Sequence, residues 1–79
     1  MRIDPTQLTY SHHARQRMTQ RNLTRHDIER VVARPTCIRD AGDSDTPGRT
    51  RHGYIRDNTV VVLDGDVVIT AYIRDRQHR

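Results

Sequence analysis

The hydrophobic period of this chain changes once, near Thr36, and that change limits the folds open to it. Before Thr36, apolar residues such as Ile28, Val31 and Val32 lie three and four positions apart, which is the spacing of an amphipathic helix. After Thr36, apolar and polar residues alternate in short runs separated by turn-forming pairs. A chain of 79 residues has room for one small domain. The pattern predicts an α+β fold with its helices first and its strands last.

Two helices are predicted in residues 11–34. Ser11 is a favourable N-cap for the first helix, and Asn22 can take the left-handed conformation that ends it. The second helix starts at Thr24, and Asp27 completes a weaker version of the capping box. Each helix therefore has a start signal in its own sequence.

Four strands are predicted after the helices, joined by turns at Asp57-Asn58 and Asp64-Gly65. Consecutive strands joined by short turns normally lie side by side, so they should form an antiparallel meander. The predicted fold is two N-terminal helices packed on one face of a curled four-stranded antiparallel sheet. The strands are expected at residues 37–39, 49–56, 59–63 and 66–73.

The chain is expected to form a single domain, 1–79, in which the helices precede the strands. A mobile loop is expected at residues 41–48, which are rich in Gly, Pro and Asp. The parts are an extended lead-in at 1–10, the two helices at 11–34, the meander at 36–73 and a tail at 74–79.

The lone cysteine and the absence of long apolar runs indicate the compartment. Cys37 has no partner for an internal disulfide, which suits a reducing environment, and we expect it to be a small core residue. No stretch approaches the roughly 18 apolar residues that a membrane span needs. The sequence predicts a cytoplasmic protein without a membrane partner.

The charge of the chain is uneven. Its net charge is +4, and all fourteen basic residues are arginine. Residues 1–39 hold eight arginines against three acidic residues, a net charge of +5, whereas residues 40–79 carry −1. Arginine suits phosphate oxygens, so we expect a polyanion to approach the helical half.

The first helix carries a stripe of chemically active side chains. At about 100° per residue, His13, Arg17 and Arg21 lie beside the edge that Ala14 buries, and His12 points away. We therefore expect His13 to be partly buried near Arg17, and His12 to be exposed. An imidazole one turn from a guanidinium can move a proton while the guanidinium holds a phosphate.

Strict alternation in the last strand predicts two faces. The side chains expected to face the helices are Val67, Ile69, Ala71 and Ile73. Those expected on the open face, or at its edge, are Val68, Thr70, Tyr72 and Arg74. The same alternation in the neighbouring strand would add His52, Tyr54 and Arg56 to the open row.

The sequence contains no motif typical of a metal or cofactor site. Adjacent His12 and His13 cannot both face one ion from a helix, so no metal and no cofactor are expected. Histidine, arginine, tyrosine and threonine can cleave RNA together, because that reaction needs a base, a cation for the phosphorane and an acid. In the competing interpretation, His13 makes structural hydrogen bonds while Arg17 and Arg21 pair with acidic residues.

The run from Ser11 to Thr24 resembles the opening of a group of small bacterial and phage proteins, domain-of-unknown-function family 4258. The spacing from Val31 to Pro35 and the ending Val68-Ile69-Thr70-Ala71-Tyr72 are also similar to that family. The family looks like a branch of the RelE-like and barnase-like ribonuclease toxins, which need no metal. Asn22 stands where the family usually has glycine between the helices. The resemblance implies catalytic roles for His13, Arg17, Arg21, Thr70 and Tyr72.

These observations lead to two functional hypotheses. The first is a small ribonuclease-like domain, a toxin, that cleaves ribosome-bound mRNA or tRNA by metal-independent transesterification. The second is a non-catalytic module that binds nucleic acid or a protein through its arginine-rich helix. An antitoxin or a host protein is a further expected partner, and both a monomer and a homodimer stay open. Substrate-binding roles are expected for Arg15, His52, Tyr54, Arg56 and Arg74.

Overall fold

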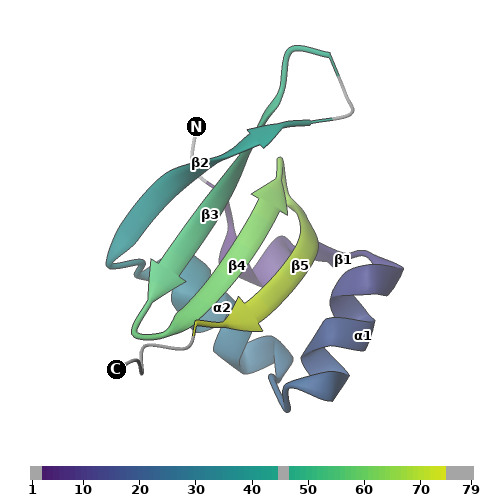
Figure 1. The fold of residues 1–79 in the computed structure, drawn as a ribbon, viewed down its shortest axis with the longest axis vertical. Coiled ribbons are helices and arrows are strands. Elements are labelled where there is room, and N and C mark those ends of the chain that lie inside the picture. The colour runs from purple at the N-terminus through teal and green to yellow at the C-terminus, as the bar shows by residue number, and fades with distance from the viewer. Residues whose placement is uncertain (1–2, 45–46, 75–79) are drawn as a thin grey trace.

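The computed structural model describes residues 3–44 and 47–74 (Figure 1). A short 3-10 helix, η1 (Pro5–Gln7), precedes a two-residue strand, β1 (Thr9–Tyr10). The helices α1 (His12–Gln20) and α2 (Arg25–Ala33) follow. The remaining elements are β2 (Cys37–Asp43), β3 (Thr50–Arg56), β4 (Thr59–Asp64) and β5 (Val67–Ile73).

The ends of α1 form as its sequence predicts. The Ser11 side chain accepts a hydrogen bond from the Ala14 amide at 3.0 Å. At the other end Asn22 has a φ of 57°, in the left-handed region. The Leu23 amide donates to the Met18 carbonyl at 2.8 Å, as in a Schellman motif. Asn22 therefore occupies the left-handed position that glycine usually takes at such a helix end.

The capping box of α2 is also present. The Asp27 amide donates to Thr24 Oγ1 at 3.1 Å, and the Thr24 amide donates to Asp27 Oδ2 at 2.9 Å. The helix ends at Ala33, just before the Arg34-Pro35 pair. Its buried face consists of Ile28, Val31 and Val32.

The sheet has five strands in the order β1-β5-β4-β3-β2. The prediction of four antiparallel strands was wrong because β1 adds a fifth, which runs parallel to β5. The Thr9 amide donates to the Asp66 carbonyl at 3.0 Å, and the Ser11 amide donates to the Val68 carbonyl at 3.0 Å. Two residues are too few to show an alternating pattern, so only the tertiary structure reveals this pairing. The other four strands pair antiparallel in the predicted meander order.

The strand β2 is longer and more exposed than the sequence predicts. It continues to Asp43, so residues 41–43 lie in a strand rather than in a loop, and residues 45–46 lie outside the described part. Among the described strands it pairs only with β3, and the hairpin of these two strands extends away from the helices (Figure 1). Every residue of β2 is exposed, so the prediction that Cys37 is a core residue was wrong. An edge strand that no helix covers has nothing against which to bury a side chain.

One core joins both helices to a single face of the sheet. In Figure 1, α2 lies behind the strands and α1 lies beside β5. The sheet face away from α2 is called the open face below. The buried side chains of the core are Leu8, Ala14, Ile28, Val31, Val32, Val61, Leu63, Val68 and Ala71.

A bulge in β5 changes which residues face this core. Leu63 pairs with Val68, whereas Val62 pairs with Thr70, so Ile69 is an extra residue between the two pairs. Val68 is consequently fully buried on the helix side, and its predicted place on the open face was wrong. After the bulge, Ala71 faces the core while Thr70 and Tyr72 lie on the open face, as predicted.

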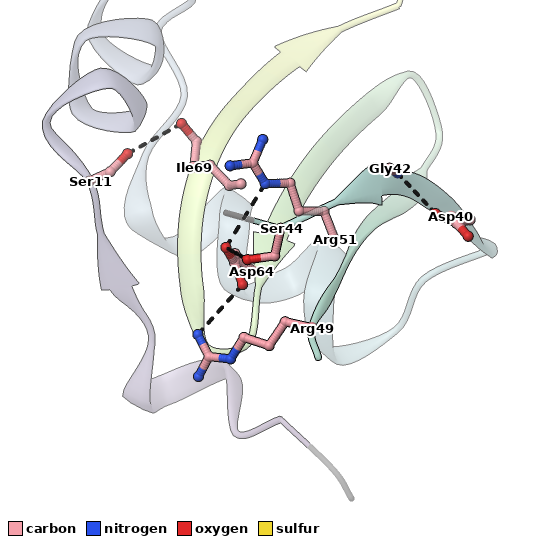
Figure 2. Close-up of polar contacts among 8 residues, drawn as sticks. All are labelled: Ser11, Asp40, Gly42, Ser44, Arg49, Arg51, Asp64 and Ile69. Atoms are coloured by element: carbon pink, nitrogen blue, oxygen red, sulfur yellow. Dashed lines mark hydrogen bonds and ion pairs between the residues drawn. The ribbon is translucent and has the colours of Figure 1, made fainter. Parts of the chain in front are cut away.

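An ionic cluster around Asp64 ties the loop end of the β2–β3 hairpin to β4 (Figure 2). The Ser44 hydroxyl donates to Asp64 Oδ2, and Arg49 Nη1 lies 3.5 Å from Asp64 Oδ1. The Nε atom of Arg51 lies 3.9 Å from Asp64 Oδ2. These contacts make Arg49 and Arg51 structural cations.

No helix in the described part of the chain has the length and apolar character needed to cross a membrane.

Candidate functional site

The stripe on α1 brings two of its three predicted members into contact. Arg17 Nε donates to His13 Nε2 at 3.4 Å, one helical turn away. Arg17 Nη1 also donates to Gln20 Oε1 at 3.1 Å. Because His13 Nε2 accepts this hydrogen bond, the lone pair of the imidazole points toward the guanidinium. The side chain of Arg21 makes no hydrogen bond or ion pair with any described residue.

The burial of this stripe differs from the prediction. His12 is exposed as predicted, but His13 is exposed as well, so its predicted partial burial was wrong. The helix α1 covers the edge of the sheet beside β5 and touches the core only through Ala14 and Met18. A helix at an edge buries a narrow stripe, which leaves the position next to Ala14 in solvent. Arg17 is half-buried.

The arginines of α1 carry charge that no described acidic residue neutralises. Elsewhere, Arg25 pairs with Glu29 at 3.3 Å, and two further arginines surround Asp64. In the described part of the chain, no ion pair involves the arginines of α1 or the one at its C-cap, and the segment from His12 to Gln20 contains no acidic residue. The arginines concerned are Arg15, Arg17 and Arg21.

The open face holds the second group of predicted site residues. Thr70 is half-buried, and Tyr72 is 39% exposed. Arg74 follows the end of β5 and is exposed; its amide donates to the Asn58 carbonyl at 2.6 Å. No hydrogen bond between described residues joins the side chains of this group to His13 or Arg17. The helix and the open face are therefore two separate candidate regions.

The residues of β3 that were predicted for the open row lie on the opposite side of the sheet. The register pairs Gly53 with Val62 and Ile55 with Val60 on the open face, so the residues between them face the helices. Tyr54 packs against the core, and Arg56 Nη1 donates to the Arg34 carbonyl at 2.9 Å. His52 instead lines a helix-side cavity of about 640 Å³, together with Tyr54, Asp4 and Asp66.

The prediction placed the β3 side chains on the wrong face for a physical reason. The residues from Arg49 to Arg56 alternate only loosely, and a one-residue change of phase moves every side chain to the other face. The open-face positions that the prediction missed are Arg51, Gly53 and Ile55.

A hollow of about 330 Å³ lies on the open face, where the predicted site residues Tyr72 and Arg74 line it, but the residues of its floor were not predicted. Gly53, Ile55, Val60 and Val62 line it from the two central strands. A glycine inside a strand often marks a place where something approaches the backbone closely, and Gly53 was the available signal. The other lining residues are Arg39, Asp40, Ala41, Tyr72 and Arg74.

The sequence of the chain matches a known protein family. Residues 10–76 match the family described as Domain of unknown function (DUF4258). The chain belongs to this family. No protein of curated function and no solved structure matches it. The DUF4258 match includes both the α1 stripe and the open-face hollow.

Two further features of this DUF4258 chain bear on its chemistry. In residues 3–44 and 47–74, no three His, Cys, Asp or Glu side chains gather in a way that could hold a metal ion. The hydroxyl of Tyr10 is buried and makes no hydrogen bond with a described residue. Burial raises the pKa of Tyr10, the Glu29 carboxylate raises it further, and Arg25 partly opposes the shift. The phenol of Tyr10 is therefore protonated and neutral near neutral pH, and its ring packs against the core.

Proposed function

We propose that this DUF4258 protein binds RNA through α1 and cleaves it by a metal-independent, ribonuclease-like transesterification. The observation that supports this proposal is the charge on α1, where three arginines make no ion pair with a described residue and one of them contacts His13. Arginine forks favour phosphate oxygens, and a neutral imidazole beside them can accept a proton. A small toxin that acts in the cytoplasm on ribosome-bound mRNA or tRNA is part of the same proposal.

The proposed reaction uses side chains alone. His13 Nε2 takes the proton of a 2′-hydroxyl, and the 2′-oxygen forms a bond to the adjacent phosphorus. The bond from phosphorus to the 5′-oxygen then breaks, and that oxygen takes a proton, for which Tyr72 is the proposed donor. The products are a 2′,3′-cyclic phosphate and a 5′-hydroxyl. Arg17 leaves His13 to join Arg21 on the phosphate, where both cations stabilise the developing charge.

Cleavage is tested on single-stranded RNA of defined sequence and on ribosome-bound mRNA, both in the presence of a chelator. We expect fragments that end in 2′,3′-cyclic phosphates. His13→Ala should remove the activity, whereas His12→Ala is the matched control, because His12 is adjacent, exposed and chemically identical. If neither substrate is cleaved, or if both variants cleave equally well, His13 is not the proton carrier.

The non-catalytic binding module is the second candidate, and one observation favours it. His13 is exposed, and no described hydrogen bond joins it to Thr70 or Tyr72. The proposed base of the reaction is therefore not in contact with a proposed acid. A binding module predicts that Arg17→Ala weakens RNA binding while His13→Ala changes nothing. The ribonuclease proposal predicts that His13→Ala keeps binding and loses cleavage.

A further inference from the structure

We infer that the hollow on the open face holds one unpaired nucleobase of an RNA strand, whose flanking phosphates bind Arg39 and Arg74. This inference rests on the proposed function for the identity of the ligand as RNA. No residue of α1 lines the hollow, and Tyr72 is the one residue that it shares with the proposed reaction, so the hollow would be a binding subsite beside the reaction centre.

The floor of the hollow is apolar and comes from the two central strands. Gly53 and Ile55 of β3 pair with Val62 and Val60 of β4, so all four positions point to the open face. Ile55 is 9% exposed and Val60 is 4% exposed, although neither belongs to the core beneath the helices. A β-carbon built on Gly53 would meet only Val60 Cγ1, at 3.8 Å. The absence of a side chain at Gly53 therefore leaves space beside Val60 that a larger residue would fill.

The rim of the hollow supplies an aromatic ring and two cations. Tyr72 lies opposite Val60 in the register, on the β5 side of the floor. Arg74 follows it along the chain, and Arg39 comes from β2 on the other side of the floor. In the described part of the chain, neither arginine side chain makes an ion pair or a hydrogen bond. One acid, Asp40, also lines the hollow, but its Oδ1 accepts a hydrogen bond from the Gly42 amide at 2.9 Å.

This combination fits a base flanked by phosphates. A nucleobase is flat and apolar on its faces, so it can lie on the valine and isoleucine floor and stack against Tyr72. The phosphates on either side of the base carry the negative charges that Arg39 and Arg74 require. The volume of about 330 Å³ is at the small end of ligand sites, which suits one base rather than a paired step.

Two properties of the ligand follow from this chemistry. The floor offers only hydrocarbon side chains, so it cannot read hydrogen bonds on the base edge, and binding should tolerate many sequences. A base inside a duplex is stacked on both faces and cannot enter the hollow. The protein should therefore bind single-stranded RNA more tightly than a duplex of the same sequence.

Binding is measured by fluorescence anisotropy with a labelled single-stranded RNA whose 2′-positions are methylated, so that it cannot be cleaved. Gly53→Val fills the hollow with a residue that strands favour, and Tyr72→Ala removes the stacking ring. Each change should weaken binding on the order of tenfold. Tyr72→Phe retains the ring and should restore the binding. Thr50→Val is the control, because it places valine in the same strand at an exposed position outside the hollow.

The outcomes separate this inference from the proposed function. If Gly53→Val and Tyr72→Ala bind like the wild type while Arg17→Ala binds weakly, the hollow is not a nucleobase site but the proposed function stands. Equal affinity for duplex and single strand would also overturn the inference. If the wild type binds no RNA, the proposed function fails first. Should Gly53→Val fail to fold, as judged by its thermal unfolding, the exposed Tyr72 variants decide alone.

Discussion

The hydroxyl of Ser11 joins the start of α1 to the bulge in β5, because it donates to the Ile69 carbonyl at 3.2 Å (Figure 2). The same oxygen accepts from the Ala14 amide at 3.0 Å, so one side chain caps the helix and fixes the bulge. Its position relates the two candidate regions, since the stripe of α1 begins two residues after Ser11 and the open-face row begins directly after Ile69.

Removal of this hydroxyl tests the connection. Ser11→Ala should lower the free energy of unfolding by about 2 kcal/mol, since a lost cap costs about 1 kcal/mol and the bond to the bulge adds a similar amount. Urea denaturation measures this loss. Hydrogen exchange should also become faster at the β5 amides around the bulge.

Thr24→Ala is the matched control, because Thr24 caps α2 and its side chain makes no hydrogen bond to another element. It should cost about 1 kcal/mol and leave exchange in β5 unchanged. An equal cost for the two changes, with no effect on β5, would mean that the bond to Ile69 contributes nothing.

Substitutions at the center of the sheet should lower the stability of this small domain strongly, whereas substitutions at the edge of the sheet should have little effect. Leu63 is 1% exposed, so Leu63→Ala should cost about 2 to 5 kcal/mol, a large part of the stability of a domain this small. Ile38 in β2 is 51% exposed, and Ile38→Ala should change stability by less than about 0.5 kcal/mol. Thermal and urea unfolding of both variants check this contrast. A large loss for Ile38→Ala would show that something covers β2 in solution.

The charge on α1 should appear in the salt dependence of RNA binding. Each arginine that replaces a counterion on a single strand contributes about 0.7 to the slope of log K against log salt. Arg17→Gln and Arg21→Gln should each make the slope shallower by about that amount. Arg25→Gln is the control, since Arg25 already pairs with Glu29 at 3.3 Å. Slopes that stay the same in the α1 variants would place the phosphates elsewhere.

The capping box of α2 should give a pH dependence. Hydrogen bonds from Thr24, chiefly from its backbone amide, hold the pKa of Asp27 below its usual value of 3.8. A carboxylate with a lower pKa in the folded state stabilises the protein above the unfolded pKa. This stabilisation is lost as the pH falls through the folded pKa.

Asp27→Asn cannot ionise, so it should be less stable than the wild type near neutral pH. The gap in melting temperature should close as the pH falls below about 4. Melting curves of both proteins between about pH 2 and pH 7 measure it. A gap of constant size would show that the ionised form contributes no stability.

The family assignment and the helix signals could be predicted from the sequence, because both depend on residues close together in the chain. Ser11, Asn22 and the pair of Thr24 and Asp27 each act within four positions, and each forms the predicted cap. The contact of His13 with Arg17 is also local, since it needs only one helical turn.

Tertiary structure decided the features that depend on distant partners. The pairing of Thr9–Tyr10 with β5 requires a strand that is far away in the sequence. The strands β4 and β5 are neighbours in the chain, but the bulge at Ile69 accepts a hydrogen bond from the distant Ser11 hydroxyl. The bulge moves Val68 into the core, and the register of β3 turns Tyr54 inward and Gly53 outward.

Exposure of His13 and Cys37 follows from the edges of the sheet, which no local pattern marks. The sequence determined which short segments form helices and strands, because neighbouring residues supply those preferences. Packing between distant segments determined which side chains meet, because a shift of one residue in register moves a side chain to the opposite face.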